Sequence, residues 1–329
     1  MNNKLIVFFS ISMMLFFSFA KAEEISYLER EEVKDFIKMM EKKHEFSSSE
    51  LVEILGTAVH QERVIRIMDR QPEGTMTWSR YRNMMVSDDR INQAKEFIES
   101  YKDQLLKAQD IYGVPAEIIA SIIGIETRYG RITGGTRVID SLMTLSFDYP
   151  RRAKFFKIQL EEFLLLSKEE GLNPKKIKGS IAGAVGYGQF MPDSYRNYAV
   201  DFDNDGVRDI VNNPIDSIGS VANFLNRKGK WSPNKPIVFK AKSRGDDPQV
   251  KSAFKPYMSV KELESLRIYS EKPIPLGQLV VPVKLPLEDG WEYRVGFDNY
   301  YSLSRYNRSK LYVMAVSDFS EEISKFFKE

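Results

Sequence analysis

Apolar residues recur at three- and four-residue spacing through the first two thirds of the chain, which is the periodicity of helices with one buried face. Segment 29–110 shows the pattern clearly, with Val33, Phe36, Ile37 and Met40 at these intervals. Because an α-helix turns once in about 3.6 residues, such side chains stack on one side of it. We therefore predict a helical N-terminal region.

Start and stop signals indicate further helices. The Ser47 hydroxyl can accept from the backbone N–H of Glu50, whose carboxylate can reach back, so a helix is expected to begin there. Gly229 is expected to end a later helix. Helical spacing predicts helices over 118–127, 151–170 and 215–228.

The composition changes after Trp231, where prolines separate short segments. Segments 278–285 and 291–297 are rich in β-branched and aromatic residues and predict strands. Segment 311–328 returns to helical spacing. The expected fold is mainly α, in the α+β class, with a small strand-containing subdomain inserted before the C-terminal helix.

The N-terminus has the pattern of a secretory signal peptide. Lys4 precedes an apolar run over 5–20, and Ala20-Lys21-Ala22 is a small-x-small cleavage site. The alternative is a retained membrane anchor, but the run is shorter than the roughly 20 residues that a span requires. We expect cleavage after Ala22 and a periplasmic protein, without a lipid anchor because the chain has no cysteine.

The composition excludes several kinds of chemistry. The chain of 329 residues has no cysteine, which rules out disulfides, thiolate metal sites and cysteine nucleophiles. It has only two histidines, so histidine-based catalysis has few candidates. The net charge of +2 and the lack of a Lys/Arg-rich block argue against a nucleic-acid partner.

One carboxylate has an unusual position. Glu126 follows Ile122 by four residues and Ile123 by three, which puts it on the apolar stripe of its predicted helix. Burial would raise the carboxyl pKa from about 4.3 and favour the neutral acid, the form that can protonate a glycosidic oxygen. The alternatives are an ion pair with Arg128 or Arg131, or a hydrated helix end.

Two motifs extend this observation. Glu126 opens the sequence Glu-Thr-Arg-Tyr-Gly, and the Gly-rich segment 183–192 ends in Gln-Phe-Met-Pro. This order is similar to lytic transglycosylases of the lysozyme-like superfamily, and more narrowly to the membrane-bound lytic transglycosylase B family. Further agreement lies at 149–153, 197–201, 219–223 and 305–307, so that the resemblance covers roughly residue 29 to the C-terminus.

The resemblance implies a lysozyme-like helical core and a reaction. Glu126 would act as general acid and then as general base, cleaving the bond between N-acetylmuramic acid and N-acetylglucosamine and closing a 1,6-anhydro ring. Glycan-strand contacts are implied as follows: Ser180 and Gln189 at the N-acetyl group, Tyr81, Phe224, Tyr306, Asn307 and Tyr312 along the cleft, and Arg151 and Arg152 near stem-peptide carboxylates.

The Gly-rich loop suits such a substrate. Its glycines allow backbone to approach a sugar closely, and Tyr187 and Phe190 offer flat apolar faces to sugar rings. Ordinary core packing is the alternative for both aromatic residues.

Segment 201–209 reproduces the first nine positions of an EF-hand calcium loop. Position 12 departs from the pattern, because Asn212 replaces the usual glutamate. The expected ligands are Asp201, Asp203, Asp205, the Val207 carbonyl, Asp209 and, as closing ligand, Asp216. A structural Ca²⁺ is therefore predicted, with no cofactor for catalysis; the alternative is a solvated acidic turn.

The expected organisation is a signal peptide (1–22), an N-terminal helical region (23–110), a catalytic core (111–231) with the EF-hand-like loop (201–216), a strand-containing subdomain (232–300) and a C-terminal segment (301–329). The function indicated is that of a lytic transglycosylase acting on peptidoglycan glycan strands. A muramidase-type hydrolase and a non-catalytic peptidoglycan-binding protein are the alternatives. A monomer is expected, with proteins of cell-wall synthesis or degradation as candidate partners.

Overall fold

The computed structural model describes residues 26–69, 76–245 and 247–328, so the predicted signal peptide lies outside the described residues. The helices are α1 (Glu31–His44), α2 (Ser48–Leu55), α3 (Glu62–Asp69), α4 (Trp78–Met85), α5 (Asp88–Tyr112), α6 (Ala116–Thr127), α7 (Val138–Phe147), α8 (Ala153–Glu169), α9 (Pro192–Tyr198), α10 (Pro214–Phe224), α11 (Val260–Ser265), α12 (Asp298–Ser304) and α13 (Lys310–Ile323). The strands are β1 (Thr136–Arg137), β2 (Lys178–Gly179), β3 (Val238–Ser243), β4 (Ile268–Ser270), β5 (Val281–Pro286) and β6 (Trp291–Gly296).

The N-terminal helices form where the sequence predicts them. The four apolar residues of the first predicted helix are all buried on α1. Helix α2 begins after Ser47, whose hydroxyl accepts a hydrogen bond from Glu50 N at 3.2 Å. This bond satisfies one of the backbone donors that a helix start leaves without an intrahelical partner.

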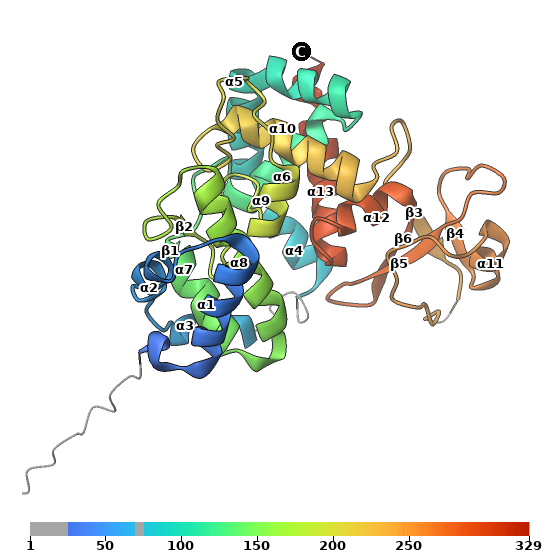
Figure 1. The fold of residues 1–329 in the computed structure, drawn as a ribbon. Coiled ribbons are helices and arrows are strands. Elements are labelled where there is room, and N and C mark those ends of the chain that lie inside the picture. Colours follow the sequence, from blue (N-terminus) through green and yellow to red (C-terminus); the bar gives the residue numbers. More distant parts are fainter. Residues whose placement is uncertain (1–25, 70–75, 246, 329) are drawn as a thin grey trace, which may run out of the picture.

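Helix α6 lies at the centre of the helical body and packs against α5, α10 and α13 (Figure 1). The sequence predicts a helix with one apolar stripe, but α6 is buried all round: Ser121 and Gly124, outside the isoleucine stripe, are as buried as Ile122. The small side chains between the isoleucines let neighbouring helices approach from every side. No single helix of the described residues is long and apolar enough to cross a membrane, although the bent pair α5 and α6 meets the length and composition criteria together.

The strand-containing part is an antiparallel sheet in the order β4-β3-β6-β5, placed to one side of the helical body beside α12 (Figure 1). Both predicted strands are confirmed as β5 and β6, which pair from Val281 opposite Gly296 to Pro286 opposite Trp291. Strands β3 and β4 were not predicted, although β3 begins with Val238 and Phe239; none of the residues of β3 is fully buried. A separate apolar cluster that includes Leu263, Ile268 and Val295 lies beneath this sheet.

The end of the predicted helix 215–228 differs from expectation. Helix α10 stops at Phe224 and continues as a π-helical turn over Leu225–Gly229. The left-handed residue that closes the turn is Lys230, with φ of 58°, and not Gly229. Gly229 instead lies against the backbone of Ser302 on α12, where its missing side chain leaves room for that contact.

A buried ion pair joins the sheet to the helical body. Arg294 on β6 donates to Asp318 on α13 from Nη1 at 2.6 Å and from Nη2 at 3.2 Å. Arg82 on α4 donates to the same carboxylate at 2.7 Å. The Arg294 and Asp318 side chains are only 4% and 6% exposed. Breaking a buried pair strands a charge away from water, so this contact should matter more than surface pairs do.

Replacement of Asp318 tests this contact. Asp318→Ala should lower the free energy of unfolding by about 3–5 kcal/mol, because it leaves the Arg294 guanidinium buried without its main partner. Urea unfolding followed by circular dichroism measures the change. The control is Lys242→Ala, which removes the exposed pair with Glu271 and should cost less than about 1 kcal/mol. Equal small losses in both variants would contradict a stabilising role for the pair.

Candidate active site

Glu126 lies in the last turn of the buried helix α6. Its side chain is half-buried, so the burial expected from sequence is only partial. The Tyr312 hydroxyl on α13 donates a hydrogen bond to Glu126 Oε1 at 2.7 Å. Burial, and then the negative charge of Glu126, raises the pKa of Tyr312 well above its usual value, so this phenol stays a donor.

Aromatic side chains surround this pair. The Tyr306 ring lies parallel to that of Tyr312, with centroids 6.4 Å apart, and its hydroxyl donates to the Gly188 carbonyl. Phe224 meets Tyr306 edge-on at 4.9 Å, and Phe190 contacts both rings. These contacts bring together three of the predicted cleft residues, Phe224, Tyr306 and Tyr312, with the Gly-rich loop.

The chain turns sharply after the helix. Arg128, Tyr129 and Gly130 all adopt left-handed backbone, with φ of 52°, 60° and 82°. Thr127 holds the turn, since its hydroxyl donates to the Tyr187 carbonyl at 2.9 Å and accepts from Gly130 N at 3.0 Å. Three consecutive left-handed residues are costly, so the surrounding contacts must maintain them.

The two arginines that sequence reasoning offered as partners of Glu126 point elsewhere. Arg128 forms an ion pair with Asp89, and Arg131 forms one with Glu96 at 2.7 Å; both acids belong to α5. These arginines therefore tie the turn to α5. A phenol, that of Tyr312, is a hydrogen-bond partner of Glu126.

Sequence reasoning missed two residues that support this turn. Arg90 donates from Nη1 to the Gly124 carbonyl at 2.8 Å, which satisfies a carbonyl near the helix end. Thr127 belongs to the motif that begins at Glu126, but no role was predicted for it. The adjacency of Thr127 to Glu126 was a usable signal, but the approach of Arg90 depends on the packing of α5 against α6, which local sequence does not show.

The polar residues of the Gly-rich loop shape the loop itself. The Ser180 hydroxyl accepts from the backbone of Ala182 and of Ala184, at 3.3 and 3.1 Å. Gln189 donates from Nε2 to Thr133 and Gly186 carbonyls, each at 3.0 Å. Both side chains are half-buried, so in this arrangement they order the loop wall beside the aromatic group.

The glycines of the loop make room for protein. A side chain at Gly186 would collide with the Ile210 carbonyl, and one at Gly183 with Leu142. Phe190 is fully buried in the aromatic group, which corresponds to the core-packing alternative, whereas Tyr187 is half-buried and covers Gly130. Internal packing therefore requires glycine at positions 183 and 186.

The remaining predicted contacts lie in different surroundings. Tyr81 on α4 is buried close enough to Tyr312 to influence its pKa, and Asn307 is half-buried beside Tyr306. Arg151 is exposed and pairs with Asp69 at 3.2 Å, while Arg152 lies over the Phe155 ring at 4.5 Å. The two arginines lie in the short 3-10 turn Pro150–Arg152 that directly precedes α8.

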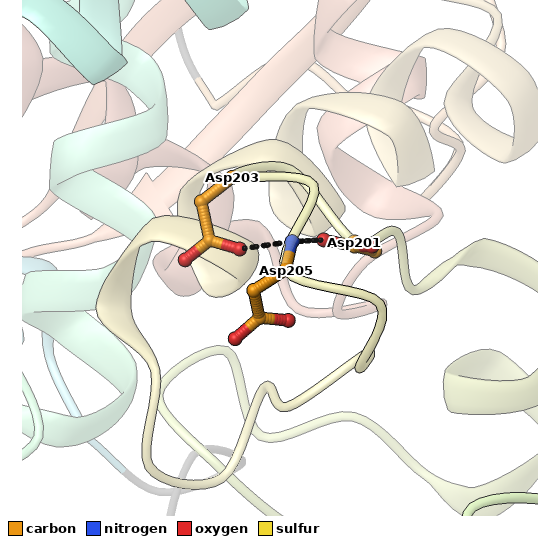
Figure 2. A group of neighbouring side chains, drawn as sticks. All are labelled: Asp201, Asp203 and Asp205. Carbon is orange, nitrogen blue, oxygen red and sulfur yellow. Dashed lines mark hydrogen bonds between the residues drawn. The ribbon is translucent and has the colours of Figure 1, made fainter.

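Three acidic residues of the EF-hand-like loop converge. Figure 2 shows Asp201, Asp203 and Asp205, which each offer an oxygen within 4.8 Å of the others. Asn204 and Gly206 turn the loop in left-handed backbone, with φ of 63° and 93°. These residues occupy positions 1, 3 and 5 of the motif, so the loop already has the turns that such a site needs.

The two later acidic residues have other contacts. Asp209 Oδ1 accepts from the backbone of Val211 and Asn212, each at 2.9 Å. Asp216 is fully buried and accepts from Phe202 N at 2.7 Å and from Asp209 N at 2.8 Å. Burial raises the pKa of Asp216. In this arrangement the Asp216 carboxylate joins the two ends of the loop, near Phe202 and at Asp209.

Comparison with known proteins decides the family. A family model described as a transglycosylase SLT domain matches residues 29–321. The chain belongs to this family. The chain is 40% identical over 298 residues to the membrane-bound lytic murein transglycosylase B of Escherichia coli K12. The matched region covers 88% of this chain and 81% of that relative.

Solved structures of similar transglycosylases share the fold. The Escherichia coli lytic transglycosylase Slt35 in complex with calcium has a TM-score of 0.83 and 39% identity, over 90% of this chain and 93% of that one. SltB1 from Pseudomonas aeruginosa has a TM-score of 0.85 and 38% identity, over 90% and 98%. The mainly helical, lysozyme-like fold expected from the sequence is confirmed, and the enzyme class is that of a lytic transglycosylase.

Gly130 tests the turn of this transglycosylase. Gly130→Ala should cost about 3 kcal/mol of stability, because a left-handed alanine is strained and its Cβ would lie 2.3 Å from the Tyr187 ring. The control is Gly171→Ala, which has φ of 62° but open space and should cost about 1 kcal/mol. Urea unfolding measures both. Equal losses would contradict the packing of Tyr187 on Gly130.

Proposed function

We propose that this transglycosylase cleaves the β-1,4 bond between N-acetylmuramic acid and N-acetylglucosamine in peptidoglycan, with Glu126 as general acid and base. One observation carries the assignment: Glu126, in the last turn of a buried helix, accepts a hydrogen bond from a tyrosine that belongs to a group of packed aromatic side chains, in a chain that matches the family over residues 29–321. Its Escherichia coli relative is named for murein, the same polymer.

In the proposed first step, Glu126 donates its proton to the glycosidic oxygen. The bond between that oxygen and C1 of the muramic acid breaks, and the N-acetyl carbonyl oxygen attacks C1. In the second step, the Glu126 carboxylate takes the proton of the muramic 6-hydroxyl, whose oxygen attacks C1 and closes the 1,6-anhydro ring, while the bond between C1 and the N-acetyl oxygen breaks and the amide carbonyl is restored. The glutamate is thereby protonated again, so one carboxyl group serves both steps.

The neighbours of Glu126 support a single-carboxylate mechanism. Usual glycosidases employ two carboxylates that flank the bond. Here the groups around Glu126 include Tyr306 and Tyr312, and burial raises the pKa of both phenols well above the usual value. Such phenols donate hydrogen bonds and do not act as bases near neutral pH, so Glu126 carries the proton transfers.

The substrate contacts remain those that the motifs imply. Tyr306 and Tyr312 offer stacked rings beside Glu126, which suits the apolar faces of sugars. A more distant structure, SltB3 from Pseudomonas aeruginosa, is in complex with NAG-NAM-pentapeptide, at 25% identity and a TM-score of 0.77 over 89% of this chain and 79% of that one. We propose a glycan that carries peptides as the substrate and the periplasm as the site of action.

The EF-hand-like loop is proposed to hold a structural Ca²⁺. The fit rests on the convergence of the Asp201, Asp203 and Asp205 carboxylates, whose hard oxygens suit calcium and which repel one another without a cation. The Val207 carbonyl, Asp209 and Asp216 complete the proposed set of calcium ligands. The ion would supply no chemistry to the reaction and would stabilise the link between the Gly-rich loop and α10.

Substitution of Glu126 tests the reaction. Glu126→Gln should lower the rate of murein solubilisation by at least about 1000-fold, because it removes the proton donor at nearly constant shape. Mass spectrometry of digested sacculi measures the products. Anhydro-muropeptides from the wild type support the proposal, reducing ends would indicate a muramidase, and no products would indicate a binding protein. Glu117→Gln, on the same helix, is the control and should retain activity.

Calcium removal tests the loop. Millimolar Ca²⁺ should raise the melting temperature by roughly 5 °C relative to excess chelator, because a ligand that binds only the folded state stabilises it. The double variant Asp201→Asn/Asp203→Asn should lose this shift. Asp289→Asn, an exposed change in the β5–β6 turn, should keep it. A wild type with no calcium-dependent shift would contradict the site.

A further inference from the structure

A basic groove lies between segment 251–257 and the stretch from Tyr301 to Arg308, which comprises part of α12 and the turn after it. It has a volume of about 420 Å³. Its charged lining residues are Lys251, Lys255, Arg305 and Arg308, and none of its lining residues is acidic. Within residues 26–69, 76–245 and 247–328, none of these four cations forms an ion pair with a carboxylate. In a chain of net charge +2, this is a local excess of positive charge.

Aromatic rings organise the groove. Lys251 lies over Tyr257, Arg305 over Tyr301 and Arg308 over Phe254, each cation 5.8–6.0 Å from the ring centre. These contacts restrict the Lys and Arg side chains before any ligand binds. An anion that binds them therefore loses less affinity to the ordering of these side chains.

The wall formed by 251–257 is fixed to the rest of the protein. Phe254 stacks on the buried Tyr300 of α12, with ring centroids 5.7 Å apart. At the end of the segment, Tyr257 N donates to the Val280 carbonyl at 3.0 Å. These two contacts attach the wall of the groove to α12 and to Val280.

The groove and the aromatic group beside Glu126 share one segment of the chain, the turn between α12 and α13. Arg305 and Arg308 flank Tyr306 in the turn between α12 and α13, and Tyr306 is stacked on the tyrosine that binds Glu126. A sugar placed at these rings would therefore lie within two residues of the groove wall. An extended five-residue peptide spans about 17 Å, so a peptide attached to that sugar can reach the cations.

We propose that this groove binds the carboxylate-bearing stem peptide of the murein strand. This inference rests on the proposed function. The sugars of a peptide-substituted strand carry no free carboxylate, whereas the peptide does, so four cations without acidic neighbours match the peptide and not the glycan. The aromatic faces suit the short apolar side chains of such a peptide.

The experiment compares two substrates at low salt: murein with its peptides and glycan strands freed of peptides by an amidase. In Lys255→Gln/Arg308→Gln, the ratio of kcat/KM for peptide-bearing over peptide-free strands should fall roughly fivefold relative to the wild type, as two exposed charge pairs allow. The difference should shrink as salt is raised, because salt screens exposed charges. Melting curves check that the variant is folded.

The control is Lys42→Gln/Lys261→Gln, which removes two exposed charges away from the groove and should keep the wild-type ratio. An unchanged ratio in the groove variant would overturn the inference, and so would an equal loss on both substrates. A wild type that releases anhydro-muropeptides from neither substrate would instead overturn the proposed function, so the two failures are distinguishable.

Discussion

The burial of helix α6 on every side is the constraint on which the structure depends. A helix this apolar can exist in water only if other helices cover it, and α5, α10 and α13 do so. Its last turn is the place where a carboxylate can reach solvent while the backbone that carries it stays fixed. The position of Glu126 is thus a product of the core, and the left-handed turn after it is maintained by residues from α5 and from the Gly-rich loop.

Much of this organisation could be predicted from sequence, because it is local. The periodicity located the helices around Val33 and Ile122, and the hydroxyl of Ser47 located a helix start. The order of short motifs indicated the family and Glu126. The alternation of aspartates after Asp201 indicated a loop whose carboxylates do converge.

The rest depends on contacts between distant segments. Whether Glu126 would be fully buried could not be read from one helix, since α6 has no polar face against which to judge it. The partners of Arg128 and Arg131 come from α5, and that of Glu126 comes from α13. Asp216 was predicted as a metal ligand from its type and spacing, and that prediction stays open; the backbone N–H bonds that its oxygens accept from Phe202 and Asp209 could not be read from the spacing. Strand β3 was missed because only its pairing with β6 makes it a strand.

Helix α13 has a mechanical role that follows from two of its contacts. Tyr312, near the start of the helix, donates a hydrogen bond to Glu126. Asp318, further along the same helix, accepts a hydrogen bond from Arg294 of the sheet. The two residues are six positions apart on one uninterrupted helix, a rise of about 9 Å. A displacement of the sheet would therefore be transmitted through this helix to the carboxyl group of Glu126, the proposed proton donor.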